Sequence, residues 1–379
     1  MALSLPTIER WESLDGKRVL VRVDFNAPVE EVDGVLTVTD DFRLRAAVPL
    51  FEALLERGAT VIACTHFGRP GGRVDERFSV APLRRALAPL CPNVELLENL
   101  RFHRGEEDND PAFGASLVEG FDYYVNEAFG ASHRPHASIM IPPTLLPSAG
   151  GPNLVREVST LLGLLDAPDR PFVAITGGAK VNDKLAIMKV LAAKADVVIV
   201  GGGMAFTFAA AENRLIGSSL FDADYVGECR ELLDGGNVLI PVDARGLPTF
   251  ARFGPEGGPD KVVDFGEDIP DDFVGLDIGP STIEIFEAAI STARTILWNG
   301  PMGVFEDPRF GAGTEAVARA IARTPAISVV GGGDSVAALS SYGLSDDVSF
   351  VSTGGGASLE LVELGDLPGL RALRESPWI

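Results

Sequence analysis

The sequence predicts an α/β fold of two similar-sized lobes, each with a mostly parallel, Rossmann-like β-sheet flanked by helices and joined by an interdomain helix. A chain of 379 residues is long for a single core, so two domains are the natural expectation. Short β-branched runs alternate with helical patterns, and their lack of strict polar alternation indicates strands buried on both faces. With 46% hydrophobic and 23% charged residues, the composition fits well-filled cores.

The expected strands are short apolar runs in both halves of the chain. In the first half they are residues 18–25, 59–65, 94–97 and 122–130, and in the second half 172–178, 196–203, 237–243, 294–300 and 327–333. Each run of the second half ends in glycine or a polar residue. Helical patterns between the runs supply the crossovers that parallel strands require.

Proline and glycine clusters flank one helical run in the middle of the chain. We therefore place an interdomain helix at 153–168, the N-terminal domain at 1–152 and the C-terminal domain at 169–358. Such a helix could transmit a hinge motion or simply pack on one lobe, and the residues leave both open. The acidic, Gly/Pro-rich segment 243–277 predicts surface loops and short strands.

The charge balance disfavours two classes of partner. With 54 Asp and Glu against 32 Lys and Arg, the formal charge of -22 repels nucleic acid and anionic membranes, so we expect neither. An acidic, lysine-poor chain also suggests a salt-rich cytoplasm, although many ordinary bacterial proteins are acidic. Cys64, Cys91 and Cys229 form no metal-binding pattern and are expected to be buried thiols. The first residues lack the pattern of a signal peptide, so we expect a cytoplasmic protein.

Glycine pairs and triplets follow the expected strands of the second half. They are Gly177-Gly178, Gly201 to Gly203, Gly300 to Gly303, Gly331 to Gly333 and Gly354 to Gly356. At the C-terminal ends of parallel strands, such loops let backbone amides and helix N-termini approach phosphate. Neither G-x-x-x-x-G-K-[ST] nor G-x-G-x-x-G after the first strand occurs, which disfavours a P-loop protein and an ordinary nicotinamide dehydrogenase.

The lysines are few and concentrated. Of six in the chain, four lie within fifteen residues of one another, just past Gly177-Gly178. We expect Lys180 and Lys184 to lie on one face of a helix and to neutralise phosphate oxygens. Lys189 and Lys194 are interpreted as part of a solvated helix face.

Arginine and histidine gather in the first half. The four histidines are His66, His103, His133 and His136, and each lies within three residues of an arginine. We interpret His103 and His136 as structural. One lobe thus suits a small, highly anionic molecule and the other a nucleotide, as phosphoryl transfer requires.

Ordered motifs over essentially the whole chain resemble the phosphoglycerate kinase family. They include "VRVDFNAP", "THFGRPGG" and "YVNEAFGASHRPHAS" in the first half, and "GGAKVNDK", "VGGGMAFTF", "WNGPMGVFE" and "VSTGGGASLEL" in the second. The resemblance implies reversible phosphoryl transfer between 1,3-bisphosphoglycerate with ADP and 3-phosphoglycerate with ATP, dependent on Mg2+, in glycolysis and gluconeogenesis. It also implies hinge closure of the two lobes and return of segment 359–379 to the N-terminal domain, and we expect a monomer.

The resemblance also implies roles for individual residues. Phosphoglycerate would be bound by Asp24, Asn26, Arg43, His66, Arg69, Arg101 and Arg134. The catalytic group would be Arg43, Lys180, Gly355 and Gly356. The nucleotide would be bound by Gly178, Lys180, Lys184, Gly202, Asn299, Gly300, Glu306, Gly331, Gly332, Gly333, Asp334 and Ser335, with Asp334 as the Mg2+ ligand. The N-terminal domain would hold phosphoglycerate and the C-terminal domain the nucleotide.

Some positions depart from the family pattern. Glu127 stands where aspartate is common, and Ser335 where threonine is frequent. The stretch 213–270 diverges most, so base contacts there stay open. Two other classes remain as alternatives: a two-lobed protein that binds a phosphorylated metabolite without turning it over, and a nicotinamide dehydrogenase. An assay of ATP consumption with 3-phosphoglycerate separates the three.

Overall fold

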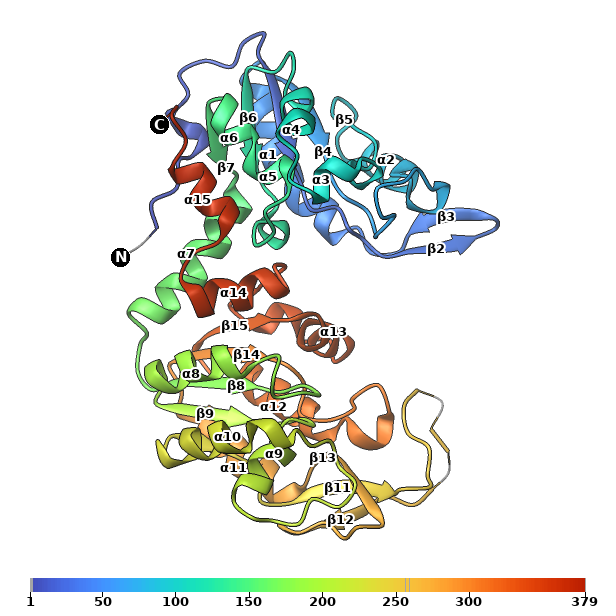
Figure 1. Ribbon diagram of the computed structural model, residues 1–379, viewed down its shortest axis with the longest axis vertical. Coiled ribbons are helices and arrows are strands. Elements are labelled where there is room, and N and C mark those ends of the chain that lie inside the picture. Colours follow the sequence, from blue (N-terminus) through green and yellow to red (C-terminus); the bar gives the residue numbers. More distant parts are fainter. Residues whose placement is uncertain (1–2, 256, 259, 379) are drawn as a thin grey trace. The chain divides into compact units, whose positions relative to one another are not determined.

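The computed structural model describes residues 3–255, 257–258 and 260–378. The chain forms two compact units (Figure 1), one made of the residues up to Leu162 and from Gly356 onward, the other Gly163–Gly355. The boundary falls inside helix α7 (Pro152–Asp166), and the chain re-enters the first unit at α14 (Gly356–Leu364). Each unit is built around its own parallel sheet.

The first unit contains a five-stranded parallel sheet in the order β5-β4-β1-β6-β7. These strands are β1 (Arg18–Arg22), β4 (Thr60–Cys64), β5 (Glu95–Leu96), β6 (Tyr123–Asn126) and β7 (Ser148–Gly150). The central strand β1 pairs Val19 with Val61 of β4 and with Tyr123 of β6. Its residues from Val19 to Arg22 are all buried, because helices and loops cover both faces of a parallel sheet, and this explains the unbroken apolar runs.

The helices of the first unit connect these strands and cover the sheet. They are α1 (Phe42–Glu56), α2 (Ala81–Leu87), α3 (Arg104–Glu107), α4 (Pro111–Leu117), α5 (Ala137–Met140), α6 (Pro142–Leu145) and α15 (Pro368–Arg374), with short 3-10 turns η1 (Ile8–Arg10), η2 (Glu76–Phe78), η3 (Leu100–Phe102) and η4 (Phe129–Ala131). A hairpin of β2 (Val29–Val32) and β3 (Val35–Val38) precedes α1. The C-terminal helix α15 packs on α5, α6 and β7, far away in sequence.

The second unit contains a six-stranded parallel sheet in the order β10-β9-β8-β14-β15-β16. The strands are β8 (Phe172–Thr176), β9 (Val197–Val200), β10 (Val238–Leu239), β14 (Thr295–Asn299), β15 (Ile327–Gly331) and β16 (Phe350–Val351). A separate antiparallel sheet, β12-β11-β13, is formed by β11 (Ala244–Pro248), β12 (Val263–Phe265) and β13 (Phe273–Ile278). This sheet accounts for the short strands expected in the Gly/Pro-rich segment.

The helices of the second unit alternate with its strands. They are α8 (Leu185–Lys194), α9 (Ala205–Ala211), α10 (Val226–Asp234), α11 (Pro280–Ser291), α12 (Ala312–Arg323) and α13 (Gly333–Ser341), with 3-10 turns η5 (Ala223–Tyr225), η6 (Pro308–Phe310) and η7 (Ser345–Asp347). Trp298 lies fully buried at the centre of the core, and its indole N–H donates to the Gly300 carbonyl at 2.8 Å. This bond satisfies the one polar atom of a buried indole.

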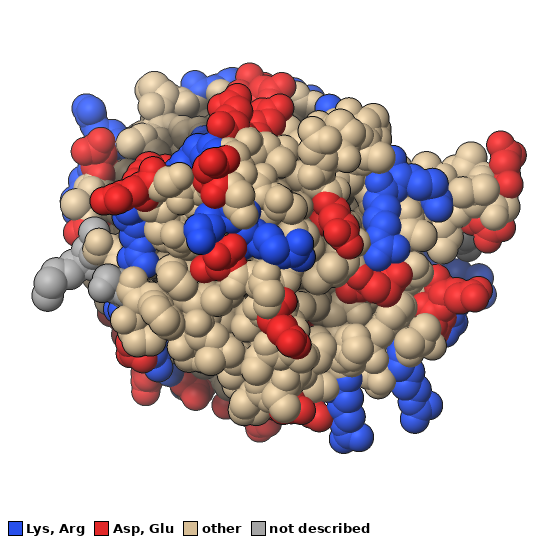
Figure 2. Space-filling view, turned by 90° about the horizontal axis from the view of Figure 1, so that it is seen from above, with Lys and Arg blue, Asp and Glu red and all other residues tan. Residues whose placement is uncertain are grey.

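The surface and the thiols agree with the composition. On the face shown in Figure 2, acidic and basic side chains are interspersed among uncharged ones. Cys64, Cys91 and Cys229 are buried thiols, as predicted. Among the helices that the structure describes, none combines the length and apolar composition needed to span a bilayer.

Candidate functional site

The glycine loops of the second unit meet at the C-terminal edge of its parallel sheet. Neighbouring strands β9, β8, β14 and β15 all end at this edge, so their loops lie side by side. Gly202 has φ 68°, and a Cβ there would come within 2.6 Å of the Gly178 backbone. Gly300 has φ 107°, and a Cβ there would lie 2.1 Å from the Gly177 carbonyl oxygen. Glycine is needed at both positions because the loops touch backbone to backbone.

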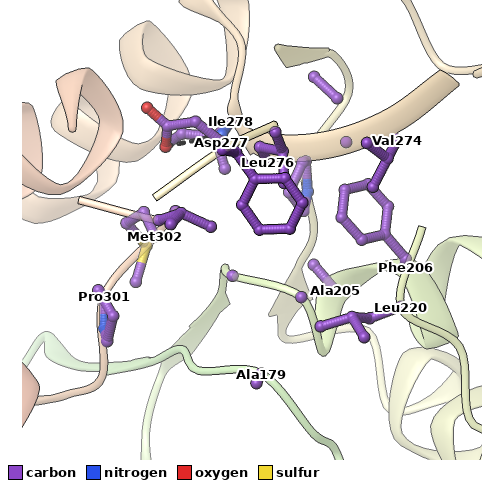
Figure 3. A pocket seen from close by; sticks show the side chains of 18 of the residues that line it. Ala179, Ala205, Phe206, Leu220, Val274, Leu276, Asp277, Ile278, Pro301 and Met302 are labelled. Atoms are coloured by element: carbon purple, nitrogen blue, oxygen red, sulfur yellow. Dashed lines mark hydrogen bonds between the residues drawn. The ribbon is translucent and has the colours of Figure 1, made fainter. Parts of the chain in front are cut away.

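These loops border a pocket of about 540 Å³ that is mostly apolar. Gly178, Gly202, Glu306 and Asp334, all predicted nucleotide-site residues, line it. Figure 3 shows Phe206 and Val274 on one side of this pocket and Pro301 and Met302 on the other. Leu220, Pro241, Thr249 and Phe253 from the divergent stretch also line it. An apolar cleft with a few polar groups at a sheet's carboxyl edge is the usual setting of a ligand site.

The first turn of α13 brings two predicted residues to this edge. Asp334 is exposed and lines the pocket, whereas Ser335 is buried and its hydroxyl accepts the Gly300 N–H. The described residues contain no group of three or more potential metal-binding side chains. A Mg2+ ion that arrives with a nucleotide needs only one or two carboxylates besides the phosphates. The exposed Asp334 carboxylate fits this requirement.

The prediction that Lys180 and Lys184 share one helix face is wrong. Helix α8 begins only at Leu185, with Lys184 as its N-cap, so Lys180 lies in the preceding loop and is exposed. The Lys184 ammonium turns inward and donates to the carbonyls of Gly177 (2.6 Å) and Asn299 (3.0 Å) and to Asn299 Oδ1 (2.6 Å). Burial lowers its pKa to about 8, against the opposing effect of Asp334 and Asp183. Lys184 thus ties the ends of β8 and β14 together.

The other lysines of this cluster lie farther along α8. Lys189 is exposed, as expected for a solvated helix face, and Lys194 donates to the Leu165 carbonyl at 3.2 Å. The remaining predicted glycines lie at the end of β15 and at the end of the second unit. Gly331 is buried, and Gly332 and Gly333 lie at the start of α13. Gly355 has φ 54° and is the last residue of the second unit, whereas Gly356 is the first residue of α14 in the first unit.

Asp277 is a buried carboxylate beside the pocket that sequence reasoning missed. It accepts the N–H groups of Gly313 and Ile278, both at 2.9 Å, and so joins β13 to the start of α12. Burial raises its pKa to about 7, although both hydrogen bonds and Arg245 act in the opposite direction. The sequence signal for Asp277 is its place in "LDIGP", near the end of the partly buried strand β13.

In the first unit, Asp24 contacts two of the other predicted phosphoglycerate-binding residues. Its carboxylate lies 2.5 Å from Arg43 Nη1 and 4.0 Å from His66 Nε2. Burial alone would raise the pKa of Asp24, but the charges of Arg43 and Arg22, together with the interaction with His66, outweigh it and lower the pKa below its ordinary value. Asp24 is therefore ionised and orients Arg43.

Arg22 fixes the tautomer of His66. It is fully buried, and its Nη2 lies 3.1 Å from His66 Nδ1. Because a guanidinium can only donate, Nδ1 must accept and the ring proton must sit on Nε2, the atom facing Asp24. Burial, and then the charge of Arg22, lowers the pKa of His66 to about 3. A neutral His66 thus presents a single N–H donor.

Hydrogen bonds to Gly68 link Asn26 and Arg101, whereas Arg134 contacts a neighbouring histidine. Asn26 Oδ1 accepts the Gly68 N–H at 3.0 Å, and Arg101 donates to the Gly68 carbonyl at 2.8 Å. Arg134 Nε donates to His133 Nε2 at 3.2 Å. Arg69 is exposed and forms no ion pair with any residue in the described parts of the chain.

A fully buried carboxylate, Glu106, balances these cations and was not singled out from the sequence. It accepts the backbone N–H and the hydroxyl of Ser138 at 2.9 and 2.7 Å, and its Oε1 lies 3.8 Å from His136 Nδ1. Ser138 in turn accepts from Arg22 Nε at 2.9 Å. Burial lowers the pKa of His136 to about 4, so His136 is a buried neutral group, and its Nδ1 has no hydrogen-bond partner among the described residues. Its structural interpretation stays a prediction.

Glu127, the unusual residue of the "NEAFG" motif, caps α7. Its carboxylate accepts the N–H groups of Asn153 and Leu154 and the Asn153 side-chain amide at 2.8 Å. The same amide donates to Ala46 of α1, the helix that carries Arg43, at 2.6 Å. A Cβ at Gly151 would lie 2.1 Å from Glu127 Oε2, so glycine makes room for the longer acid. Burial raises the pKa of Glu127 to about 7 despite these donors.

Comparison with known proteins extends over both units. The phosphoglycerate kinase family model matches residues 10–96 and 90–364. The chain is 48% identical to phosphoglycerate kinase of Rubrobacter xylanophilus, over 96% of each chain, and 46% identical to that of Moorella thermoacetica, over 96% of this chain and 97% of the other. The solved structure of phosphoglycerate kinase from Coxiella burnetii matches with a TM-score of 0.88 at 32% identity, over 98% of this chain and 99% of that one. The chain therefore belongs to the phosphoglycerate kinase family.

Proposed function

We propose that this chain catalyses reversible phosphoryl transfer between 1,3-bisphosphoglycerate with ADP and 3-phosphoglycerate with ATP. One observation carries the proposal: the family match spans both the arginine–histidine cluster of the first unit and the glycine-lined pocket of the second. As a member of this family, the chain is a phosphotransferase.

The phosphoglycerate end of the reaction is assigned to the first unit. Asp24, Asn26, Arg43, His66, Arg69, Arg101 and Arg134 would bind the substrate. Arginine suits phosphate and carboxylate because its planar fork makes two parallel hydrogen bonds. His66 would donate from Nε2, the position that its bond with Arg22 dictates. The exposed Arg69, which forms no ion pair within the described residues, would pair with the substrate.

The nucleotide is assigned to the pocket of the second unit. Its apolar walls suit a base, Glu306 would accept from the ribose hydroxyls, and the loops ending in Gly178, Gly202 and Gly332 would give backbone donors to the phosphates. Lys184 keeps a supporting role, since its three hydrogen bonds hold the loops that do so. Asp334 would hold Mg2+, which supplies neutralisation of phosphate charge when bound.

Phosphoryl transfer to the substrate carboxylate requires stabilisation of negative charge and does not require a general base. The attacking group of 3-phosphoglycerate is a carboxylate with an intrinsic pKa of about 3.5, already ionised at neutral pH. Lys180, Arg43 and the main-chain amides of Gly355 and Gly356 would stabilise the charge on the transferring phosphoryl oxygens. Oriented groups of this kind are worth several kcal/mol of barrier. The exposed ammonium of Lys180 is free to take this role, unlike that of Lys184.

The setting of the enzyme is also proposed. We infer a cytoplasmic monomer that uses small molecules only and binds neither nucleic acid nor membranes, consistent with its formal charge of -22. Closure of the two domains, Mg2+ dependence and adaptation to a salt-rich cytoplasm stay predictions.

A coupled assay tests the proposal. Purified chain with ATP, Mg2+ and 3-phosphoglycerate should supply 1,3-bisphosphoglycerate to glyceraldehyde-3-phosphate dehydrogenase and so consume NADH. Omitting 3-phosphoglycerate is the control and should abolish the signal. ATP-independent reduction of a nicotinamide cofactor would favour the dehydrogenase alternative, and substrate binding without turnover would favour the binding-protein alternative.

A further inference from the structure

A second, smaller cavity adjoins the nucleotide pocket. It has a volume of about 20 Å³, room for about one water molecule. The two cavities share Ala205, Phe206, Pro241, Asp243 and Ala244 in their linings. Phe206, in the first turn of α9, is the largest of the shared side chains, so its ring forms most of the wall that can separate the two spaces.

Packing on the side of the larger pocket holds this ring in place. Gly275 of β13 lies against it, and a Cβ at that position would come within 2.3 Å of Phe206 Cζ and 2.7 Å of Cε1. The same Cβ would lie 3.0 Å from Ile269 Cδ1, a residue of the smaller cavity. Figure 3 shows the ring beside Val274, the neighbour of Gly275. A single extra methyl group at 275 would therefore have to move the Phe206 ring.

Asp243 and Ser218, two polar residues near this wall, form hydrogen bonds within the protein. Asp243 accepts the backbone N–H groups of Ser281 and Thr282, each at 2.8 Å, and the Thr282 hydroxyl as well. Ser218 donates its hydroxyl to the Asp271 carbonyl at 3.0 Å. We infer that shape contributes to discrimination at this end of the pocket, because Asp243 and Ser218 already hydrogen-bond within the protein.

The position of the wall fits the base end of a nucleotide. Pro301 and Met302, on the loop that leads to Glu306, lie on the side of the pocket opposite Phe206 (Figure 3). If Glu306 takes the ribose, as proposed above, the outer edge of the base points away from that loop and toward Phe206.

We propose that Phe206 is a specificity-determining residue whose ring sets the depth of the base pocket and excludes purines with a large substituent on the exocyclic amine. The proposal rests on the assignment of this pocket to the nucleotide. Phe206→Ala removes the phenyl ring from the wall and is expected to join the two cavities. A benzyl group on the exocyclic amine of adenine would replace the volume that is lost.

Binding calorimetry with ADP and N6-benzyl-ADP tests this directly. The wild type should prefer ADP, and Phe206→Ala should shift the ratio of the two dissociation constants toward the benzyl analogue by roughly tenfold or more, the scale at which hydrophobic pockets discriminate size. Leu220→Ala is the matched control: it removes an apolar side chain from the same pocket but away from the smaller cavity, and should leave the ratio unchanged.

Gly275→Ala adds a methyl group against the same ring from within the larger pocket and provides a second variant if Phe206→Ala fails to fold. It should displace the ring and change the ratio, with circular dichroism showing a native spectrum. An unchanged ratio in a folded Phe206→Ala or Gly275→Ala protein, or an equal shift in Leu220→Ala, would overturn the proposal, as would the absence of ADP binding to the wild type. Wild-type ADP binding without turnover of 3-phosphoglycerate and ATP would instead contradict the proposed function alone.

Discussion

Replacing Glu127 with glutamine is expected to remove a pH-dependent loss of stability in the first unit. The Glu127 side chain is only 7% exposed, yet the pKa of its carboxyl lies at about 7 against an ordinary value of 4.5. Between these values the folded protein keeps the carboxyl protonated while the unfolded chain ionises it. Stability is therefore full below pH 4.5 and is lost as the pH rises toward 7.

The size of the effect follows from the two pKa values. A gap of about 2.5 at 1.36 kcal/mol per pH unit comes to about 3.4 kcal/mol over the whole window. The sequence pI of about 4.6 makes the acidic end of this window poorly suited to solution work, since proteins are least soluble near zero net charge. From pH 5.5 to 7 the free energy of unfolding should still fall by about 1.6 kcal/mol more in the wild type than in Glu127→Gln.

Urea unfolding followed by tryptophan fluorescence measures this difference. Both proteins would carry Trp298→Phe, so that Trp11 and Trp378 report on the first unit alone. Glu119→Gln, which alters an exposed carboxyl in the same unit, is the control and should track the wild type. Parallel pH profiles for the wild type and Glu127→Gln would refute the reasoning, because they would mean that burial does not perturb this carboxyl.

Three further predictions concern the reaction. Arg43→Ala and Lys180→Ala should each lower kcat by about 10²–10³ in the coupled assay with the fold intact, whereas Lys189→Ala should not; near wild-type turnover in both would remove their assigned roles. Asp334→Asn should raise the Mg2+ concentration needed for half-maximal rate, and chelation of Mg2+ should abolish turnover of the wild type; an unchanged Mg2+ requirement would exclude Asp334 as a ligand. The radius of gyration from small-angle scattering should decrease when both substrates are present, and a constant radius would speak against domain closure.

The strands could be predicted from the sequence because their signal is local. Runs such as 18–25 and 172–178 contain β1 and β8, and burial on both faces makes each run apolar without a break. Likeness to solved phosphoglycerate kinases confirms the predicted α/β fold of two parallel-sheet lobes. The positions of the glycine loops could be predicted from the ends of these strands, because the carboxyl ends of parallel strands lie at one edge of the sheet.

Lys184 shows where sequence reasoning failed. Its spacing from Lys180 suggested a shared helix face, but spacing has that meaning only inside a helix, and α8 starts one residue after Lys184. Three oxygen acceptors at the ends of β8 and β14 decide its direction, and these come together only in the folded unit.

The pocket walls and buried acids could not be found from the sequence for a related reason. Phe206 and Leu276 look like ordinary core residues, and only the tertiary structure places them around a cavity. Glu106 looks like any acid of a charged surface run, yet it is fully buried beneath Ser138 and the arginines. Burial of a single polar residue depends on contacts distant in sequence, which local patterns do not encode.

Trapping the reaction product tests the central claim most directly. Hydroxylamine converts an acyl phosphate to a stable hydroxamate, so incubation of the chain with ATP, Mg2+ and 3-phosphoglycerate should yield one equivalent of hydroxamate for each ADP released. Lys180→Ala should slow both products together. Release of ADP without hydroxamate would show that the phosphoryl group goes to water, and would contradict transfer to the carboxylate of phosphoglycerate.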